Sequence, residues 1–274
     1  MTKTFIVTGA NTGIGKITAT TLAKDGHHVI LACRSKDKTE AVLAEIKREV
    51  PAANVEFVPL DLGDLASVRA CAQALLDRNI PIHGLINNAG LAGARGFTKS
   101  GFELAFGVNH VGHFLLTTLL LDRIRSAGKA RIVTVASKAH YRAKTIDFDA
   151  VRKPTATRTA LPEYGVAKLA NVLFTAELAR RLAGTGITTY SLHPGVVATD
   201  VWRSVPWPFR SLIKQFMITV DQGAETTLYC ATSPACEAET GLYYDTSRSV
   251  EPGAAAKNGE LAAELWRRSE EWVS

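Results

Sequence analysis

Short, β-branched apolar runs alternate with amphipathic stretches along most of the chain. The apolar runs have the length and composition of buried strands, and they occupy residues 5–8, 28–32, 55–58, 85–87, 131–135 and 188–192. Between them, apolar residues recur at helical spacing, most clearly over 14–25, 37–50 and 65–76, and Asp64 is placed to cap the last helix. The alternation predicts an α/β fold with right-handed βαβ units and a mostly parallel sheet. Helices should cover both faces of this sheet, because its strands are apolar throughout.

The sequence shows no internal domain boundary. Its 274 residues, 46% of them hydrophobic, contain no Pro-, Gly- or Ser-rich linker and no repeat. An α/β domain of this length can bury a sufficient core without disulfides. We therefore predict one doubly wound, Rossmann-type domain over residues 1–274, in which the segment at about 199–219 forms an irregular flap over the substrate.

Composition and charge narrow the class of protein. No apolar run reaches the roughly 20 residues of a membrane span, and the N-terminus lacks a signal-peptide pattern. The sequence thus predicts a cytoplasmic protein with no membrane span. The four cysteines are too scattered for a disulfide framework or a metal site, so we expect buried thiols. The net charge of +6 fits nucleic acid, anionic lipid or a phosphate-rich ligand, or else a merely solvated basic surface.

A glycine-rich turn follows the first predicted strand and precedes the first predicted helix. It reads Thr8-Gly-Ala-Asn-Thr-Gly-Ile-Gly15. Glycines let the backbone approach a ligand closely, and a helix N-terminus presents unpaired N–H groups and a positive dipole end to a pyrophosphate. A tight turn without a ligand is the alternative, but the position between strand and helix favours a dinucleotide site.

The end of the second predicted strand indicates which dinucleotide binds. An acidic residue there would hydrogen-bond the 2′-hydroxyl of NAD, whereas an arginine accommodates the 2′-phosphate of NADP. Here no carboxylate ends the strand, and Arg34 follows it with Lys36 and Lys38 nearby. A guanidinium binds a phosphate well in forked geometry. We therefore predict NADP(H) rather than NAD(H), with a solvated basic helix start as the alternative.

Tyr164 and Lys168 stand four residues apart in an amphipathic stretch, so their side chains share one helical face. An ammonium near a phenol favours the phenolate and lowers the pKa of the tyrosine. Such a tyrosine can donate a proton to a carbonyl or take one from an alcohol. This pair alone is frequent by chance, so the neighbouring motifs decide its interpretation.

Six motifs together resemble the short-chain dehydrogenase/reductase family in order and approximate spacing. They are the glycine turn at 8–15, Asn87-Asn88-Ala89-Gly90, Asn109, Ser137, Tyr164-x-x-x-Lys168 and Pro194-Gly195. Two sequence segments, 108–114 and 164–171, resemble those of the retinol-dehydrogenase and protochlorophyllide-reductase-like branch. The spacing of 27 positions between Ser137 and Tyr164 also resembles that branch. Members of that branch often carry an N-terminal membrane anchor, for which this sequence shows no pattern.

The resemblance implies a role for each of four catalytic residues. Tyr164 would be the general acid in reduction and the base in oxidation, and Lys168 would lower its pKa and bind the nicotinamide ribose. Ser137 would hydrogen-bond and polarise the substrate carbonyl. Asn109 would hold a helix irregularity and a water that relays the proton. Ala167 stands where a serine is more usual, which leaves the Tyr164–Lys168 pair intact.

The resemblance also implies a set of cofactor-binding residues beside Arg34, Tyr164 and Lys168. The set comprises Gly9, Asn11, Thr12, Gly13, Ile14 and Gly15 around the pyrophosphate, Asp61 and Leu62 at the adenine, Asn88, Ala89 and Gly90 beside the adenosine ribose, and Pro194, Gly195, Val197 and Thr199 at the carboxamide. In this family the cofactor carries the hydride, and the protein supplies orientation and electrostatics.

The sequence thus predicts an NADP(H)-dependent oxidoreductase that interconverts a carbonyl and an alcohol. The substrate loops should be 90–97, 139–161 and 201–216. Aromatic residues in the last loop, at 202, 207, 209 and 216, fit an apolar molecule of the steroid, retinoid, polyketide or aromatic ketone type. Reduction of an activated C=C bond and a catalytically silent cofactor-binding sensor remain alternatives.

Other partners follow from the resemblance or from the absence of motifs. Relatives commonly pair through the helices that start near Asn109 and Tyr164, so a homodimer or homotetramer is possible. No nucleic-acid motif accounts for the basic charge, so most of it should be solvated surface. His110 and His113 are expected to pack or hydrogen-bond rather than bind a metal, because no third ligand follows at a regular spacing.

Overall fold

The computed structural model describes residues 2–195 and 219–274. Its sheet has eight strands in the order β3-β2-β1-β4-β5-β6-β7-β8. Their bounds are β1 Thr4–Thr8, β2 His28–Cys33, β3 Val55–Pro59, β4 Gly84–Asn87, β5 Ala130–Val135, β6 Ile187–His193, β7 Leu242–Asp245 and β8 Arg248–Ser249. All neighbours are parallel except the antiparallel β7–β8 pair. The predicted doubly wound, mostly parallel fold is confirmed.

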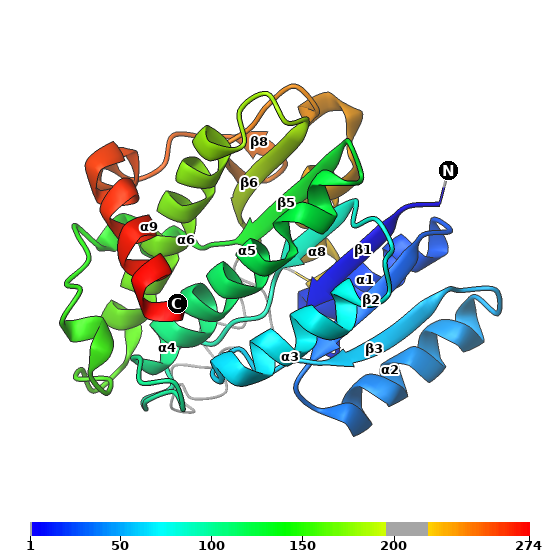
Figure 1. Ribbon diagram of the computed structural model, residues 1–274, viewed down its shortest axis with the longest axis horizontal. Coiled ribbons are helices and arrows are strands. Elements are labelled where there is room, and N and C mark those ends of the chain that lie inside the picture. Colours follow the sequence, from blue (N-terminus) through cyan, green and yellow to red (C-terminus); the bar gives the residue numbers. More distant parts are fainter. Residues whose placement is uncertain (1, 196–218) are drawn as a thin grey trace.

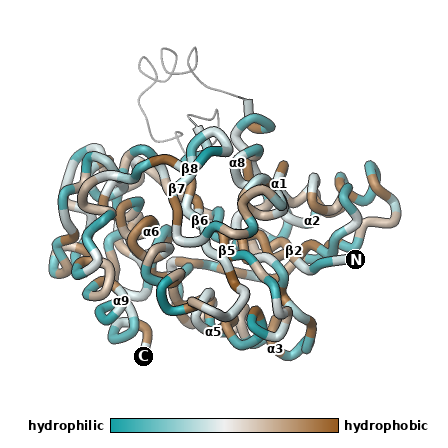
Figure 2. Tube along the Cα trace, turned by 90° about the horizontal axis from the view of Figure 1, so that it is seen from above, coloured by the Kyte–Doolittle hydropathy of each residue, from teal (hydrophilic) through white to brown (hydrophobic). Residues whose placement is uncertain are grey.

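Helices cover both faces of this sheet (Figure 1). Their bounds are α1 Gly13–Lys24, α2 Lys36–Glu49, α3 Leu65–Leu76, α4 Leu104–Phe106, α5 Gly112–Arg125, α6 Leu161–Arg181, α8 Val220–Thr232 and α9 Gly259–Val273. Helices α1, α2 and α8 enclose one core, and α3, α5 and α6 enclose the other. The same two layers are visible from above in Figure 2, with the strands between them. Helix α9 packs on α6 from outside.

Strand alternation explains the two cores. Phe5 and Val7 of β1 face the α1/α2/α8 layer, whereas Ile6 between them faces the α3/α5/α6 layer, and all three are at most 1% exposed. Strands buried on both sides are apolar at every position, which is why they could be recognised from the sequence. The cysteines are free and buried within these layers, as predicted.

The predicted elements of the first two thirds agree with the structure to within one or two residues. The helix predicted over 65–76 is α3, and the Asp64 side chain accepts a hydrogen bond from the backbone N–H of Ala66 at 3.0 Å, as expected of a cap. The hairpin of β7 and β8 was not predicted. Its turn places Thr246 and Ser247 at positive φ of 49° and 58°, so the usual glycine signal is absent.

One apolar helical stretch is longer than the sequence pattern indicated. Residues Leu104–Arg125 join α4, a π-helical turn and α5, and this stretch is long and apolar enough to cross a membrane. Its most apolar window is 72% buried inside the protein. Buried helices of protein cores meet the same criteria of length and composition, and packing against α3 and α6 accounts for the apolar surface here.

The strand order reverses between β1 and β4. Strand β1 pairs with β2 on one side and with β4 on the other, so the connections after β1 and β4 leave the carboxyl edge of the sheet in opposite directions. Ligands of doubly wound sheets bind in the crevice that forms at such a point. The glycine turn and the 88–90 turn are therefore brought together at this edge.

Candidate active site

The glycine turn packs tightly against the turn that follows β4. A Cβ atom at Gly9, whose φ is +65°, would lie 2.9 Å from Ala89. A Cβ at Gly15 would lie 2.4 Å from Asn88 Nδ2, and this amide group donates a hydrogen bond to the backbone oxygen of Thr8 at 2.8 Å. Both glycines are therefore required by the contact between the two turns, before any ligand is considered.

The N-terminus of α1 is open. Its first intrahelical hydrogen bond runs from the backbone N–H of Lys16 to Thr12, at 3.2 Å, and the exposed Thr12 side chain makes no capping bond. Among the described residues, the backbone N–H groups of Gly13, Ile14 and Gly15 have no hydrogen-bond partner. Three free donors at the positive end of a helix suit an anionic group such as a pyrophosphate.

Asn11 connects the glycine turn to the start of α2. Its side-chain amide donates to Thr39 Oγ1 at 3.2 Å, and that hydroxyl donates to the backbone oxygen of Ser35 at 2.6 Å. Arg34 lies directly before Ser35, is exposed, and makes no ion pair within the described ranges. The backbone at Arg34 therefore adjoins the segment that Asn11 ties to the glycine turn, while Lys36 faces Glu40 at 3.7 Å.

The remaining predicted cofactor residues differ in their contacts and in their exposure to solvent. Asp61 Oδ1 accepts from the backbone N–H of Gly63 at 2.9 Å, and Leu62 is buried in the core. Pro194 and Gly195 are half-buried after β6. The other predicted residues of this segment lie outside the described residues. They are Val197, Thr199, the 201–216 loop with its four aromatic residues, and all but the last residue of the predicted flap.

Three predicted catalytic side chains meet after β5. Ser137 follows this strand, and its hydroxyl accepts from the backbone N–H of Ala139 at 3.2 Å. Tyr164 lies on the first turn of α6, where the Ser137 side chain is near enough to lower the pKa of its hydroxyl. One turn later, the buried Lys168 donates from Nζ to the backbone oxygen of Val135 at 2.7 Å, with Nζ 5.6 Å from the centroid of the Tyr164 ring.

Burial governs the charges of this group. It raises the pKa of Tyr164, an effect that the nearby Ser137 side chain partly opposes. It also lowers the pKa of Lys168 to about 7. The predicted lowering of the Tyr164 pKa by Lys168 is therefore not seen, because the ammonium is itself disfavoured by burial and is directed at Val135. The phenol keeps its proton at neutral pH, and Lys168 titrates there.

Asn109 lies in the π-helical turn Gly107–Val111, which is the helix irregularity that the resemblance implied. Its side chain accepts from the backbone N–H of Leu91 at 2.9 Å and donates to the Leu91 oxygen at 3.0 Å. Gly90 separates Asn109 from the lysine. A Cβ there would lie 3.0 Å from Asn109 Oδ1 and 3.5 Å from Lys168 Nζ. Proton relay through a water at Asn109 stays a prediction.

His140 supports the serine, and sequence reasoning missed this. Its Nδ1 lies 2.7 Å from the backbone oxygen of Ser137, and its Nε2 accepts from the backbone N–H of Gly253 at 2.9 Å. The fully buried ring thereby fixes the Ser137 segment against the C-terminal part of the chain. No sequence signal marks this role, because Gly253 is 113 residues away from His140.

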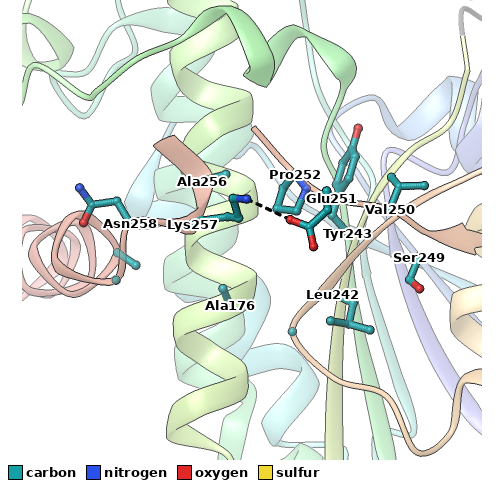
Figure 3. A pocket seen from close by; sticks show the side chains of 13 residues that line it. Ala176, Leu242, Tyr243, Ser249, Val250, Glu251, Pro252, Ala256, Lys257 and Asn258 are labelled. Atoms are coloured by element: carbon teal, nitrogen blue, oxygen red, sulfur yellow. Dashed lines mark hydrogen bonds and ion pairs between the residues drawn. The ribbon is translucent and has the colours of Figure 1, made fainter. Parts of the chain in front are cut away.

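A separate hollow of about 430 Å³ lies between α6 and the segment after β7 (Figure 3). Ala176, Leu242 and Tyr243 line it together with an ion pair between Glu251 and Lys257 at 3.1 Å. None of the predicted site residues that the structure describes lines this hollow. In the same described ranges, no three His, Cys, Asp or Glu residues are grouped as metal ligands.

A doubly wound sheet with free N–H groups at a helix N-terminus beside its switch point, next to Ser137, Tyr164 and the buried Lys168, defines the class of dinucleotide-dependent oxidoreductases. The family model described as short chain dehydrogenase matches residues 3–148. Retinol dehydrogenase 12 of Mus musculus is 42% identical over 273 residues, which cover 97% of this chain and 85% of the mouse protein. The chain belongs to the short-chain dehydrogenase/reductase family, and it is similar to retinol dehydrogenases.

Solved structures agree with this assignment. An uncharacterized protein from Mycobacterium paratuberculosis superposes with a TM-score of 0.78 at 33% identity, over 99% of this chain and 93% of that one. A 3-ketoacyl-(acyl-carrier-protein) reductase from Brucella melitensis, solved with NADH, gives a TM-score of 0.70 at 26% identity, over 89% and 96% of the two chains. The protein is therefore an oxidoreductase whose family is consistent with carbonyl–alcohol interconversion.

Proposed function

We propose that the protein is an NADP(H)-dependent oxidoreductase that interconverts a carbonyl and an alcohol on an apolar small molecule, with Tyr164 as acid and base. The observation that carries this proposal is the meeting of Ser137, Tyr164 and the buried Lys168 after β5. Gly90 joins this group to the turn that packs on the glycine turn. The similarity to proteins named for retinol, an apolar alcohol, supports the substrate class.

The residues present fit a nicotinamide dinucleotide. The free N–H groups of Gly13, Ile14 and Gly15 would hold the pyrophosphate. Arg34, exposed and without a carboxylate partner in the described ranges, would hold a 2′-phosphate. Lys168 would reach the ribose hydroxyls next to the nicotinamide. When bound, the cofactor supplies or accepts the hydride.

The protein residues then manage the substrate oxygen and its proton. In reduction, the Ser137 hydroxyl donates a hydrogen bond to the carbonyl oxygen and polarises it. Tyr164 donates its phenolic proton to the same oxygen as negative charge develops there. The raised pKa of Tyr164 keeps the phenol protonated at neutral pH, which suits this direction. In oxidation, Tyr164 must first lose its phenolic proton to solvent, and the phenolate then takes the hydroxyl proton of the alcohol.

Substrate class is tested by turnover of the wild-type protein. A panel of retinoids, steroids, aromatic ketones, aldehydes and enones is offered with NADPH, and the fall in NADPH absorbance is followed. We expect turnover of apolar carbonyl compounds. Turnover of enones at the C=C bond, with no reduction of any carbonyl, would overturn the proposed reaction, and products are identified by mass spectrometry.

Cofactor preference is tested with Arg34→Asp. A charge-assisted hydrogen bond contributes about 1.5–3 kcal/mol, so we expect the Kd for NADPH to rise at least about tenfold and the Kd for NADH to change little. Arg48→Asp, which makes the same charge change at the far end of α2, is the control and should leave both Kd values near the wild-type values. Equal losses of NADPH and NADH affinity in Arg34→Asp would show that this arginine does not bind the 2′-phosphate.

A further inference from the structure

A ring of hydrogen bonds links the glycine turn to Asn109, and His113 closes it. His113 lies on the first turn of α5 and is 2% exposed. Its Nδ1 is 3.0 Å from the backbone oxygen of Asn109, and its Nε2 is 2.9 Å from Thr8 Oγ1. The imidazole therefore bridges the π-helical turn and the last residue of β1.

The donors of this ring follow from the chemistry of its groups. A carbonyl oxygen only accepts, so Nδ1 of His113 carries the hydrogen and donates to Asn109. Burial lowers the pKa of His113 to about 4, so the imidazole is neutral at pH 7 and Nε2 accepts from the Thr8 hydroxyl. The Thr8 oxygen in turn accepts the backbone N–H groups of Asn88 and Ala89, each at 2.9 Å. The backbone oxygen of Ile86 also lies within reach of the Thr8 hydroxyl, at 3.3 Å, but Nε2 of His113 is the nearer acceptor at 2.9 Å.

The rest of the ring passes beside the catalytic lysine. Ala89 leads through Gly90 to Leu91, and the backbone N–H and oxygen of Leu91 both bond to the Asn109 side chain. At Gly90 the ring comes so close to Lys168 that an added Cβ would lie 3.5 Å from Nζ. A change in the separation of Thr8 and Asn109 would thus be transmitted to the surroundings of the lysine.

We propose that His113 is a positioning residue of the oxidoreductase site. Its neutral Nδ1–H tautomer holds the glycine turn and the Asn109 turn at a fixed separation, and thereby sets the position of the 88–91 segment between the cofactor site and Lys168. His113 is buried behind the two turns and acts through them rather than by touching substrate or cofactor. The inference rests on the proposed function only in so far as its kinetic readouts require turnover.

His110 provides a matched contrast in the same segment. It is 1% exposed, yet its Nε2 lies 3.0 Å from Ser269 Oγ of α9, and that hydroxyl donates to the backbone oxygen of Leu265 at 2.7 Å. His110 therefore bonds to the C-terminal helix and takes no part in the ring. His110, three positions before His113 in the sequence, is thus a buried histidine with a structural role against which His113 can be compared.

The kinetic test compares His113→Phe with His110→Phe at neutral pH. His113→Phe keeps a ring in place but loses two buried hydrogen bonds, so we expect kcat to fall and the Kd for NADPH to rise, each at least about tenfold. His110→Phe should leave both within about twofold of wild type. In the double variant with Thr8→Val, the combined loss should be smaller than the sum of the two single losses, because both changes break the bond between Thr8 and His113. Additive losses, or equal kinetics of the two histidine variants, would overturn the inference.

A second variant and a spectroscopic readout keep the test decisive. If His113→Phe does not fold, His113→Asn takes its place, since it keeps a donor toward Asn109 and loses only the bond to Thr8. Wild-type kcat and NADPH affinity in that variant would also overturn the inference. Imidazole ¹⁵N chemical shifts of the wild-type protein should show His113 as the neutral Nδ1–H tautomer. An Nε2–H tautomer or a charged ring at neutral pH would contradict it.

The two proposals fail in different ways. A wild-type protein that binds NADPH and shows the Nδ1–H tautomer, but reduces no carbonyl compound, would refute the proposed function and leave the ring intact. A wild-type protein that turns over while His113→Phe matches His110→Phe would refute the role of His113 alone.

Discussion

Acid should destabilise the folded chain through His110, and the substitution His110→Phe should remove this sensitivity. The His110 ring packs among Phe106, Phe114 and Phe174, with centroid distances of 5.2, 6.1 and 5.9 Å. Burial in this aromatic cluster lowers the pKa of His110 to about 3 from an ordinary value of 6.5. A phenylalanine fits the chemistry of these surroundings and carries no titratable group.

The sign and magnitude follow from proton binding. Below pH 6.5 the unfolded chain takes up a proton at His110, whereas the folded chain does not until about pH 3, so falling pH favours unfolding. Between pH 6.5 and pH 5 this site alone costs the wild-type protein about 2 kcal/mol of stability, at about 1.4 kcal/mol per pH unit. At pH 7, His110→Phe loses only the bond to Ser269, which contributes about 1 kcal/mol. The variant should be the less stable protein at pH 7 and the more stable one at pH 5.

Urea unfolding of both proteins at pH 7, 6 and 5, followed by circular dichroism and tryptophan fluorescence, measures this difference. The other histidines titrate equally in both proteins, so the difference between the two free energies of unfolding isolates His110. Parallel pH dependences of wild type and variant would refute the reasoning, because they would mean that His110 is protonated alike in the folded and unfolded states.

Gly90→Ala should lower kcat at least about tenfold with little loss of stability, because the added methyl group would lie 3.0 Å from Asn109 Oδ1; kcat within about twofold of wild type would contradict this. Gly112→Ala should destabilise the fold by about 1–3 kcal/mol, because its Cβ would lie 2.4 Å from the backbone oxygen of Leu62, and an unchanged thermal midpoint would contradict this. We also expect light scattering to show a monomer near 29.5 kDa. Relatives were expected to pair through α5 and α6, and Trp266 of α9 packs on both of these helices. A stable dimer that persists on dilution would show that this cover does not prevent pairing.

The fold could be predicted where local pattern and tertiary environment agree. Strands such as Thr4–Thr8 are buried on both faces, so their apolar composition was a sufficient signal. The hairpin at the far edge was missed because β7 has only four residues and its turn residues, Thr246 and Ser247, adopt positive φ without glycine. A short edge strand gains its stability from pairing with β6, which no local pattern reveals.

The sequence predicted which residues form the site, but it did not predict their pKa values. Helical spacing alone placed Tyr164 and Lys168 on one face of α6, and the structure agrees. The direction of the Tyr164 pKa was wrong, because it depends on how deeply both groups are buried rather than on their spacing. The bonds made by His113 and His140 join segments about 105 and 113 residues apart, so they became visible only with the fold.

Turnover by Tyr164→Phe tests the central claim most directly. The substitution removes only the hydroxyl that donates the proton, so NADPH should bind with a Kd within about threefold of wild type while kcat falls at least about a hundredfold, the range of general acid–base contributions. Turnover of Tyr164→Phe is measured beside wild type with the best carbonyl substrate of the panel, and NADPH binding is measured separately by fluorescence. Undiminished kcat in Tyr164→Phe would contradict the assignment of Tyr164 as the acid and with it the proposed mechanism.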